Sequence, residues 1–285
     1  MRGRAIGFLG TAGVALFAAA VTVAACPLAV ANAATPLASH RAVYDLKLLR
    51  THGKRGLQSV RGRILYDFSG NACEGYVLQF RQVSELDTGE GKVALSDLRA
   101  STWEDGAGKD FRFNSQNYVN DKMANGVDGR ADRRGGKVAV ALTKPKQATF
   151  DIEANVAFPT EHMRRIIEAA RAGESMLEFP VYDGSENGER VYNTLTVIGR
   201  EIEANESPLT DATAGQAALA GLKRWPVTIS YFDRASAPGE QTPVYAISFQ
   251  IYENGVSRAL TLDYGDFAVS GEMSQLEMNP SRPCP

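Results

Sequence analysis

The feature that most constrains this chain is a long series of short segments in which apolar and polar residues alternate. The apolar side chains of Ala42–Leu48 recur at every second position, and Ile64–Phe68 and Gly75–Arg81 follow the same pattern. This period of two is typical of strands that bury one face. Turn residues separate the segments, and Glu253–Gly255 is the clearest tight hairpin turn. Further segments of this kind lie at 95–103, 109–113, 137–143, 148–153, 176–182, 190–200, 225–232, 244–252, 257–264 and 267–276.

Only one segment, at about 160–172, has the period of a strong helix. Thr160 is a candidate for its N-cap, and Gly173 suits the position that follows its C-terminus. A parallel sheet needs a crossover helix between successive strands, and the sequence lacks such helices. Roughly twelve strands, spaced about ten residues apart, therefore predict a mainly β, single-domain antiparallel curled sheet. We expect it to be spiral-like or barrel-like, with this one helix packed against it.

Residues 1–33 have the pattern of a cleavable secretory signal peptide. Two arginines in the first four residues precede an uncharged, largely apolar segment at 5–31. Ala31-Asn32-Ala33 then supplies small residues at the first and third positions before a cut between Ala33 and Ala34. Cleavage there leaves residues 34–285 as an exported β-rich domain in the periplasm. No later segment approaches about eighteen consecutive apolar residues, so we expect no transmembrane segment in the mature chain and a soluble domain.

Two alternatives to cleavage remain open. The apolar segment is long enough to act as a permanent membrane anchor. Val23-Ala24-Ala25-Cys26 also loosely resembles a lipobox, in which the cysteine is lipidated and becomes the new N-terminus. Leu is the usual residue where Val23 stands, and the downstream Ala-X-Ala sequence fits better. Cleavage after Ala33 is therefore the preferred interpretation.

Cys73 and Cys284 are the two cysteines that follow the leader. An even pair in an exported chain is typical of a disulfide, because the compartment is oxidising. Such a bridge ties the Pro-rich C-terminal end to the turn that precedes Gly75–Arg81. The alternative is a reactive thiol, but the sequence contains no Cys-X-X-Cys motif and neither cysteine has a histidine nearby.

Charge and composition argue against two classes of function. The formal charge is −2, whereas a nucleic-acid-binding protein needs a basic face. Three His and three Cys are little material for a zinc site. The sequence also holds no P-loop and no dinucleotide-binding glycine motif. We therefore expect no nucleic-acid partner, no metal and no cofactor.

Catalytic residues are hard to assemble from this sequence. His40, His52 and His162 are its only imidazoles, so a Ser-His-Asp triad has to use one of them. Glu104-Asp105 beside Trp103 is the nearest candidate for the paired acids of a glycan hydrolase. We interpret it as a solvated hairpin turn beside a buried tryptophan. The acids of Asn125–Asp132 do not fit a calcium loop, and we interpret that segment as a polar turn. The preferred expectation is that the protein has no catalytic residues.

Aromatic residues fall on alternating strand positions, which leaves two interpretations open. They either fill an ordinary core or line a curled sheet that encloses an apolar ligand. The residues concerned are Tyr44, Tyr66, Phe68, Tyr76, Phe80, Phe111 and Phe113.

Several segments together resemble one known family. They are Ser39–Leu46, Gly62–Phe68, Cys73–Tyr76 and the helix entry Phe158–His162, which follow a secretory leader. The chain is similar over nearly all of its exported part to the EipB cell-envelope integrity family of Gram-negative α-proteobacteria. The resemblance implies a periplasmic protein with a spiral-like antiparallel sheet, similar to periplasmic lipoprotein-carrier folds, and one disulfide. It also implies a role in envelope integrity, without enzymatic activity.

The sequence thus favours a non-enzymatic periplasmic protein that supports cell-envelope integrity. We expect it to bind a protein or lipidic ligand of the envelope, in or on the curled sheet. The alternatives are a periplasmic lipid or lipoprotein carrier and, less favoured, a peptidoglycan or glycan hydrolase.

Overall fold

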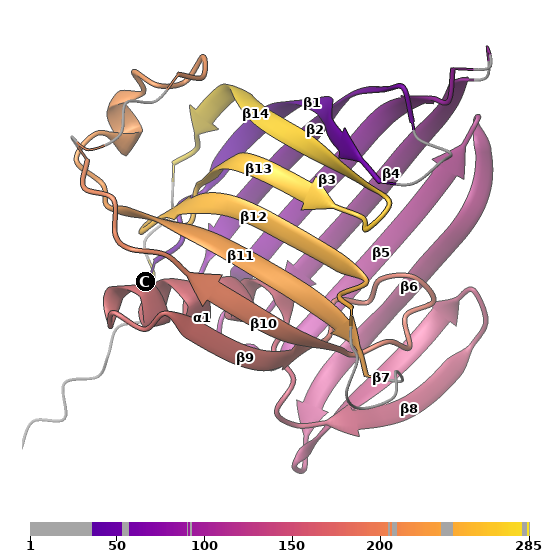
Figure 1. Cartoon of the computed structure of the whole chain (residues 1–285). Coiled ribbons are helices and arrows are strands. Elements are labelled where there is room, and N and C mark those ends of the chain that lie inside the picture. Colours follow the sequence, from indigo (N-terminus) through magenta and orange to yellow (C-terminus); the bar gives the residue numbers. More distant parts are fainter. Residues whose placement is uncertain are drawn as a thin grey trace, which may run out of the picture. The chain divides into compact units, whose positions relative to one another are not determined.

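Within the described residues, fourteen strands form one antiparallel sheet, which Figure 1 labels along the chain. The computed structural model describes residues 36–52, 57–89, 91, 93–204, 206, 210–234, 242–280 and 284, all in the compact unit of residues 34–285. The expected signal peptide, its cut between Ala33 and Ala34, and Cys26 lie outside the described residues. The strands are β1 (His40–Thr51), β2 (Ser59–Asn71), β3 (Gly75–Asp87), β4 (Val93–Glu104), β5 (Asp110–Val119), β6 (Lys122–Arg134), β7 (Lys137–Lys144), β8 (Ala148–Glu153), β9 (Met176–Val181), β10 (Tyr192–Ile198), β11 (Arg224–Asp233), β12 (Tyr245–Tyr252), β13 (Ser257–Asp263) and β14 (Phe267–Met278).

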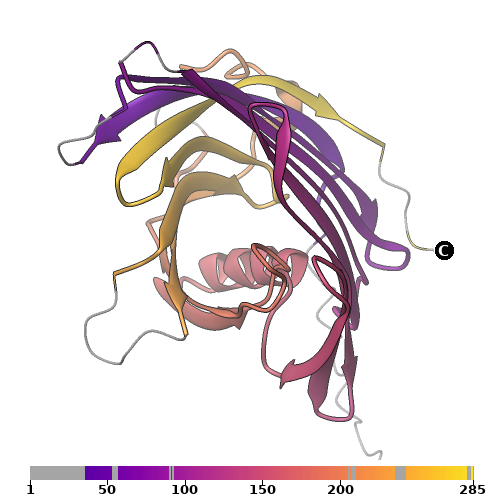
Figure 2. The same cartoon turned by 90° about the vertical axis from the view of Figure 1, so that its right-hand side faces the viewer.

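The sheet is curled but not closed. Its order is β8-β7-β6-β5-β4-β3-β2-β1-β14-β13-β12-β11-β10-β9, so the first and last strands pair in the interior of the sheet. The two free edges, β8 and β9, are consecutive in the chain and are separated by the helix α1 (Pro159–Arg171). We call β1 to β8 one limb of the sheet and β9 to β14 the other. Viewed end-on, the two limbs curve around α1 (Figure 2). The expected antiparallel curled sheet with one packed helix is confirmed.

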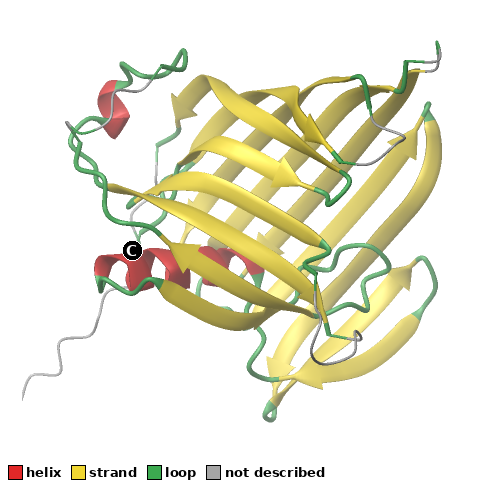
Figure 3. Ribbon diagram, in the orientation of Figure 1, coloured by secondary structure: helices red, strands yellow, loops and turns green. Residues whose placement is uncertain are grey.

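The start of α1 differs from the prediction in one respect. Phe158 occupies the N-cap position without a side-chain hydrogen bond, and Pro159 begins the helix. Proline suits this position because its fixed φ is helical. An N–H group at this position would have no acceptor within the helix, so proline loses no hydrogen bond by lacking one. The prediction that Thr160 caps the helix is therefore wrong. The other end is as expected, because Gly173 follows the C-terminus with a φ of 77°. Figure 3 shows α1 in red against the yellow sheet.

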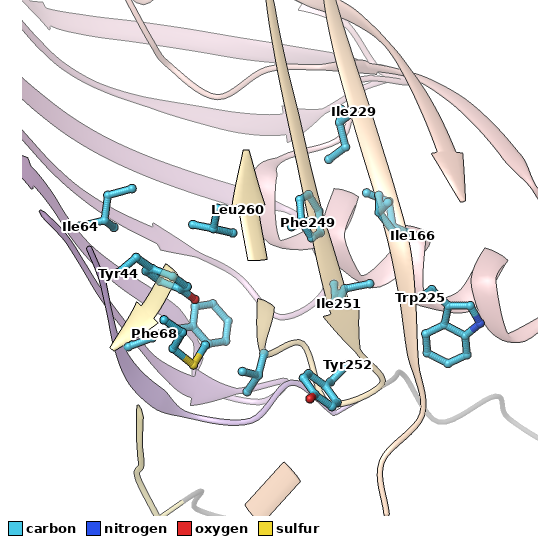
Figure 4. Close-up of a cluster of buried hydrophobic side chains, with 14 of the residues drawn as sticks. Tyr44, Ile64, Phe68, Ile166, Trp225, Ile229, Phe249, Ile251, Tyr252 and Leu260 are labelled. Carbon is cyan, nitrogen blue, oxygen red and sulfur yellow. The ribbon is translucent and has the colours of Figure 1, made fainter. Parts of the chain in front are cut away.

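The core lies between the two limbs and α1. The alternation in β1 is confirmed, because Ala42, Tyr44 and Leu46 are buried on one face. A second, smaller cluster around Phe111 and Phe113 packs under β5 to β8. Figure 4 shows the main cluster, which includes Tyr44, Ile64, Phe68, Ile166, Trp225, Ile229, Phe249, Ile251, Tyr252 and Leu260.

The segment Asn125–Asp132 is part of β6, so its interpretation as a polar turn is wrong. β6 pairs with β5 and β7 and turns Val127, Gly129 and Ala131 towards the second cluster. Two of these three residues are small, and the alternation therefore carries little apolar signal. At Gly129, Phe113 and a leucine of β7 fill the space that a side chain would need, and Ala131 pairs with Phe111 and Val140.

In the part of the chain that the structure describes, no helix is both long and apolar enough to cross a bilayer.

Candidate functional site

A cavity of about 300 Å³ lies between the limbs of the sheet. Strands β1 to β3 form one wall, β11 to β13 form the other, and the first turn of α1 contributes Pro159, His162 and Met163. This volume is at the small end of the range of ligand sites, about 300–1,000 Å³. The lining is mainly apolar: Ile64, Leu78, Phe80, Met163, Val181, Ile229, Ile247, Phe249, Leu260 and Leu262.

The aromatic residues singled out in the sequence divide between the two interpretations. Tyr44, Tyr66 and Phe80 line the cavity. Phe111 and Phe113 instead belong to the filled second cluster. The curled sheet therefore has both a packed core and an open interior.

One end of the cavity is covered by α1, which is held there by a buried acid. Glu104, at the end of β4, is 1% exposed and accepts hydrogen bonds from the backbone N–H groups of Thr160 (2.7 Å) and Glu161 (2.8 Å). These are among the N–H groups that a helix start leaves without partners, so Glu104 caps α1 across the fold. Burial raises the pKa of Glu104 to about 7, and the two N–H groups oppose that rise. The expectation of a solvated turn is wrong for Glu104, and Trp103 beside it is only half-buried.

The two acids considered for glycan hydrolysis are occupied by backbone contacts. Both oxygens of Glu104 bind the start of α1, and Asp105 accepts the N–H groups of Ala107 (2.9 Å) and Lys109 (3.2 Å) in the hairpin turn. The described residues also include no group of three His, Cys, Asp or Glu placed to hold a metal.

Two of the three histidines line the cavity. The Nδ1 of His40 lies 2.8 Å from the carbonyl oxygen of Ala38, and the Nε2 of His162 lies 3.5 Å from Oγ1 of Thr194. Burial, assisted by the nearby Arg165, lowers the pKa of His162 to about 4, so this imidazole is neutral at neutral pH. The Thr194 hydroxyl donates to a backbone carbonyl, and among the described residues no carboxylate hydrogen-bonds to either ring. This is not the arrangement of a nucleophile, a base and an orienting acid.

The other end of the cavity is bordered by a row of aromatic rings, here called the aromatic rim. Tyr231 pairs with Tyr245 where β11 ends and β12 begins. Trp225 and Tyr252 lie at the other ends of these two strands. Successive ring centroids are 6.0, 5.8, 5.2 and 4.9 Å apart. The rim consists of Tyr192, Tyr231, Tyr245, Tyr264 and Phe267.

Polar groups at this end are only partly satisfied. The hydroxyls of Tyr231 and Tyr245 have no hydrogen-bond partner among the described residues, whereas Gln82 donates to the Tyr264 hydroxyl (3.4 Å) from the opposite limb. Burial raises the pKa of Tyr231 and of Tyr245 well above the usual value. Both rings therefore present neutral hydroxyls to the cavity.

Asp183, just beyond β9, is the acid that lines the cavity. Its carboxylate accepts the backbone N–H of Ser185 at 2.9 Å. Burial raises its pKa, and the negative charge of Glu186 adds to the effect. Sequence reasoning missed Asp183 because the segment Asp183–Gly188 has the composition of an ordinary turn. The aromatic rim was missed as well, although Tyr231 and Tyr245 lie in predicted strands at paired positions.

Cys73 and Cys284 form a disulfide, with Cα atoms 5.7 Å apart. Cys73 lies in the turn between β2 and β3, where Asn71 Oδ1 accepts its backbone N–H at 2.8 Å. Neither cysteine lines the cavity. The pair ties the C-terminal end to this turn and is not a free thiol.

Comparison with known proteins shows which family has this fold. A family model described as EipB-like matches residues 31–280. The chain is 38% identical over 248 residues to the cell envelope integrity protein EipB of Brucella abortus, covering 87% of this chain and 86% of that protein. A crystal structure from Brucella abortus, titled as a beta-barrel-like protein of a domain of unknown function, superposes with a TM-score of 0.80 at 38% identity, covering 87% of this chain and 100% of that one. The chain belongs to the EipB-like family.

Proposed function

We propose that this protein is an exported, non-enzymatic factor of the periplasm that supports cell-envelope integrity by binding a lipidic ligand in the cavity of its curled sheet. The observation that carries the proposal is the cavity itself, with its apolar lining and its end bordered by the aromatic rim. Apolar cavities with a few polar groups are the usual form of small-ligand sites. The name of the Brucella abortus relative supports the envelope role.

A growth assay tests the envelope role. A strain that lacks the gene is expected to lose viability in detergent and in cell-wall antibiotics, and the wild-type gene is expected to restore it. Survival of the deletion strain at the wild-type level would contradict the role.

A pair of neighbouring substitutions on β3 tests whether the cavity is needed. Leu78 lines the cavity, and the larger side chain introduced by Leu78→Trp takes up part of its volume. Gln79 is exposed on the other face, where it donates to Ser101, so Gln79→Trp adds the same ring outside. We expect Gln79→Trp, and not Leu78→Trp, to restore the deletion strain, with both variants folded and disulfide-bonded. Full complementation by Leu78→Trp would show that the role does not use the cavity.

Export is part of the proposal and has its own test. Mass spectrometry of the protein from its host is expected to give a mature N-terminus at Ala34, because Ala31 and Ala33 suit signal peptidase. An acylated N-terminus at Cys26 would show a lipoprotein instead.

A carrier of lipids or lipoproteins is the second candidate, and the unclosed sheet, whose edge strands β8 and β9 do not pair, favours it. A carrier both takes up and delivers its cargo. Transfer of a labelled lipid from donor to acceptor vesicles, faster with the protein than without it, distinguishes a carrier from a protein that only binds.

A further inference from the structure

Charge at the rim end of the cavity is unbalanced towards the negative. Glu186 and Asp233 both pair with Arg190, each at 2.8 Å. Asp183 forms no ion pair with any described residue, and the nearby charge that acts on it is another carboxylate, that of Glu186. A carboxylate that borders an apolar cavity without a cation loses hydration, and at Asp183 this loss outweighs the hydrogen bond from Ser185. A positive charge brought by a ligand would offset that loss.

The rings beside Asp183 suit the same ligand. Asp183 and Tyr231 line one cavity, and the charge of Asp183 acts on the hydroxyls of Tyr231 and Tyr192. The faces of tyrosine rings attract ammonium groups, and several rings around one cation are the usual way in which proteins hold amines. The unpartnered hydroxyl of Tyr231 can also accept a hydrogen bond from an ammonium N–H.

Other charges near the cavity do not oppose this assignment. His162 is neutral, and Arg165 of α1 is paired with Glu161 and stacked on the ring of Phe179 at 4.2 Å. Beyond the rim end the lining is mainly apolar, and a volume of about 300 Å³ equals roughly ten water molecules. That space suits one alkyl chain of moderate length.

We propose that the cavity binds an amphiphile with a single alkyl chain and a protonated amine head. The chain lies among the apolar side chains, and the ammonium lies at the rim end between the carboxylate of Asp183 and the ring of Tyr231. This inference rests on the proposed function, since it assumes that the cavity takes an amphiphilic ligand.

Four small probes distinguish binding of an amine head group from binding of an alkyl chain alone. Decylamine, decanol and decanoate share one chain and differ in the head group, and ethylamine has the head group without the chain. Each probe is titrated against the protein purified from its host, with displacement of an apolar fluorescent dye as the readout. We expect decylamine to bind about tenfold more tightly than decanol and more tightly still than decanoate, and ethylamine not to bind.

Asp183→Asn is the decisive variant. Asparagine has nearly the same shape and can still accept the N–H of Ser185, so the turn is retained. We expect the variant to lose most of the tenfold preference for decylamine and to bind decanol within about twofold of wild type. Asp151→Asn is the control, because it removes an exposed carboxylate on β8, where its partner is Lys137. This variant is expected to keep the preference.

The outcomes are distinguishable. If decanol binds and decylamine binds no better, or if Asp183→Asn keeps the preference, the amine head is wrong and the cavity can still serve the proposed function. If ethylamine binds as tightly as decylamine, the site takes free amines and the amphiphile is wrong. If none of the chain-bearing probes binds, lipidic binding in the cavity fails, and the amine head fails with it.

Discussion

Glu104 is a carboxyl group whose charge opposes folding. Its pKa in the folded protein is about 7, against an ordinary value of 4.5. The folded state therefore binds the proton more tightly than the unfolded state between these two values. It follows that this group makes the free energy of unfolding fall as pH rises from about 4.5 to about 7, by about 3 kcal/mol in total.

Glu104→Gln tests this prediction. Glutamine keeps one acceptor for the N–H groups of Thr160 and Glu161 but cannot ionise. We expect its stability to rise relative to wild type by about 3 kcal/mol between pH 4.5 and pH 8, measured by urea unfolding with the disulfide intact. Parallel pH profiles for the two proteins would contradict the assignment. Because Glu104 is a structural group here, the folded variant is also expected to complement the deletion strain.

Residues such as Glu104 and Asp183 show where sequence reasoning stops. Both stand at the edge of polar, turn-like segments, and that composition predicts a solvated side chain. Their environments are instead set by elements distant in the chain. Glu104 meets α1 more than fifty residues later, and Asp183 lines the same cavity as Tyr231 of β11. Local composition contains no signal for either contact.

At the scale of elements, the sequence predicted strands wherever large apolar side chains alternate. β1, β2 and β3 belong to this group, and so do the strands of the second limb. β6 was not predicted as a strand, because its inward positions include Gly129 and Ala131. Small residues there are a consequence of packing against large ones on the neighbouring strands, since Gly129 pairs with Phe113. A pattern method that searches for large apolar residues misses such a strand.

Gly129 allows a direct test of this explanation. A Cβ at this position would lie 2.7 Å from Phe113 Cζ, 2.7 Å from Leu142 Cδ2 and 3.0 Å from a backbone oxygen. We therefore expect Gly129→Ala to lower the free energy of unfolding by about 1–3 kcal/mol, the usual cost of overpacking.

Gly126→Ala is the matched control in the same strand. Its Cβ would meet no atom closer than 3.5 Å, which is an ordinary contact. We expect this variant to unfold within about 0.5 kcal/mol of wild type in urea. Equal effects of the two substitutions would mean that close packing is not why Gly129 is small.

At the scale of the whole domain, the pairing of β1 with β14 organises the sheet. Sequence patterns predicted an antiparallel curled sheet but not this pairing, because strand order depends on contacts between the two ends of the chain. The pairing brings the C-terminal end close to β1, where the N–H of Asn279 donates to the Ser39 carbonyl (2.9 Å). Because β1 also pairs with β2, the turn that carries Cys73 lies within reach.

The disulfide then acts mainly on the unfolded chain. It joins residues that are 211 positions apart, and closing so long a loop in the unfolded state is worth about 5 kcal/mol on the chain-entropy model. The folded sheet does not depend on the bridge for its hydrogen bonds, since β1 and β14 pair from His40–Met278 to Thr51–Phe267. We therefore expect the double variant Cys73→Ser/Cys284→Ser to fold with an unchanged circular dichroism spectrum and to be less stable by up to about 5 kcal/mol in urea. Wild-type protein unfolded under reducing conditions is the control and is expected to match the double variant, because both lack only the bridge. A double variant as stable as oxidised wild type would show that the bridge follows from the β1–β14 pairing without adding to the stability of the domain.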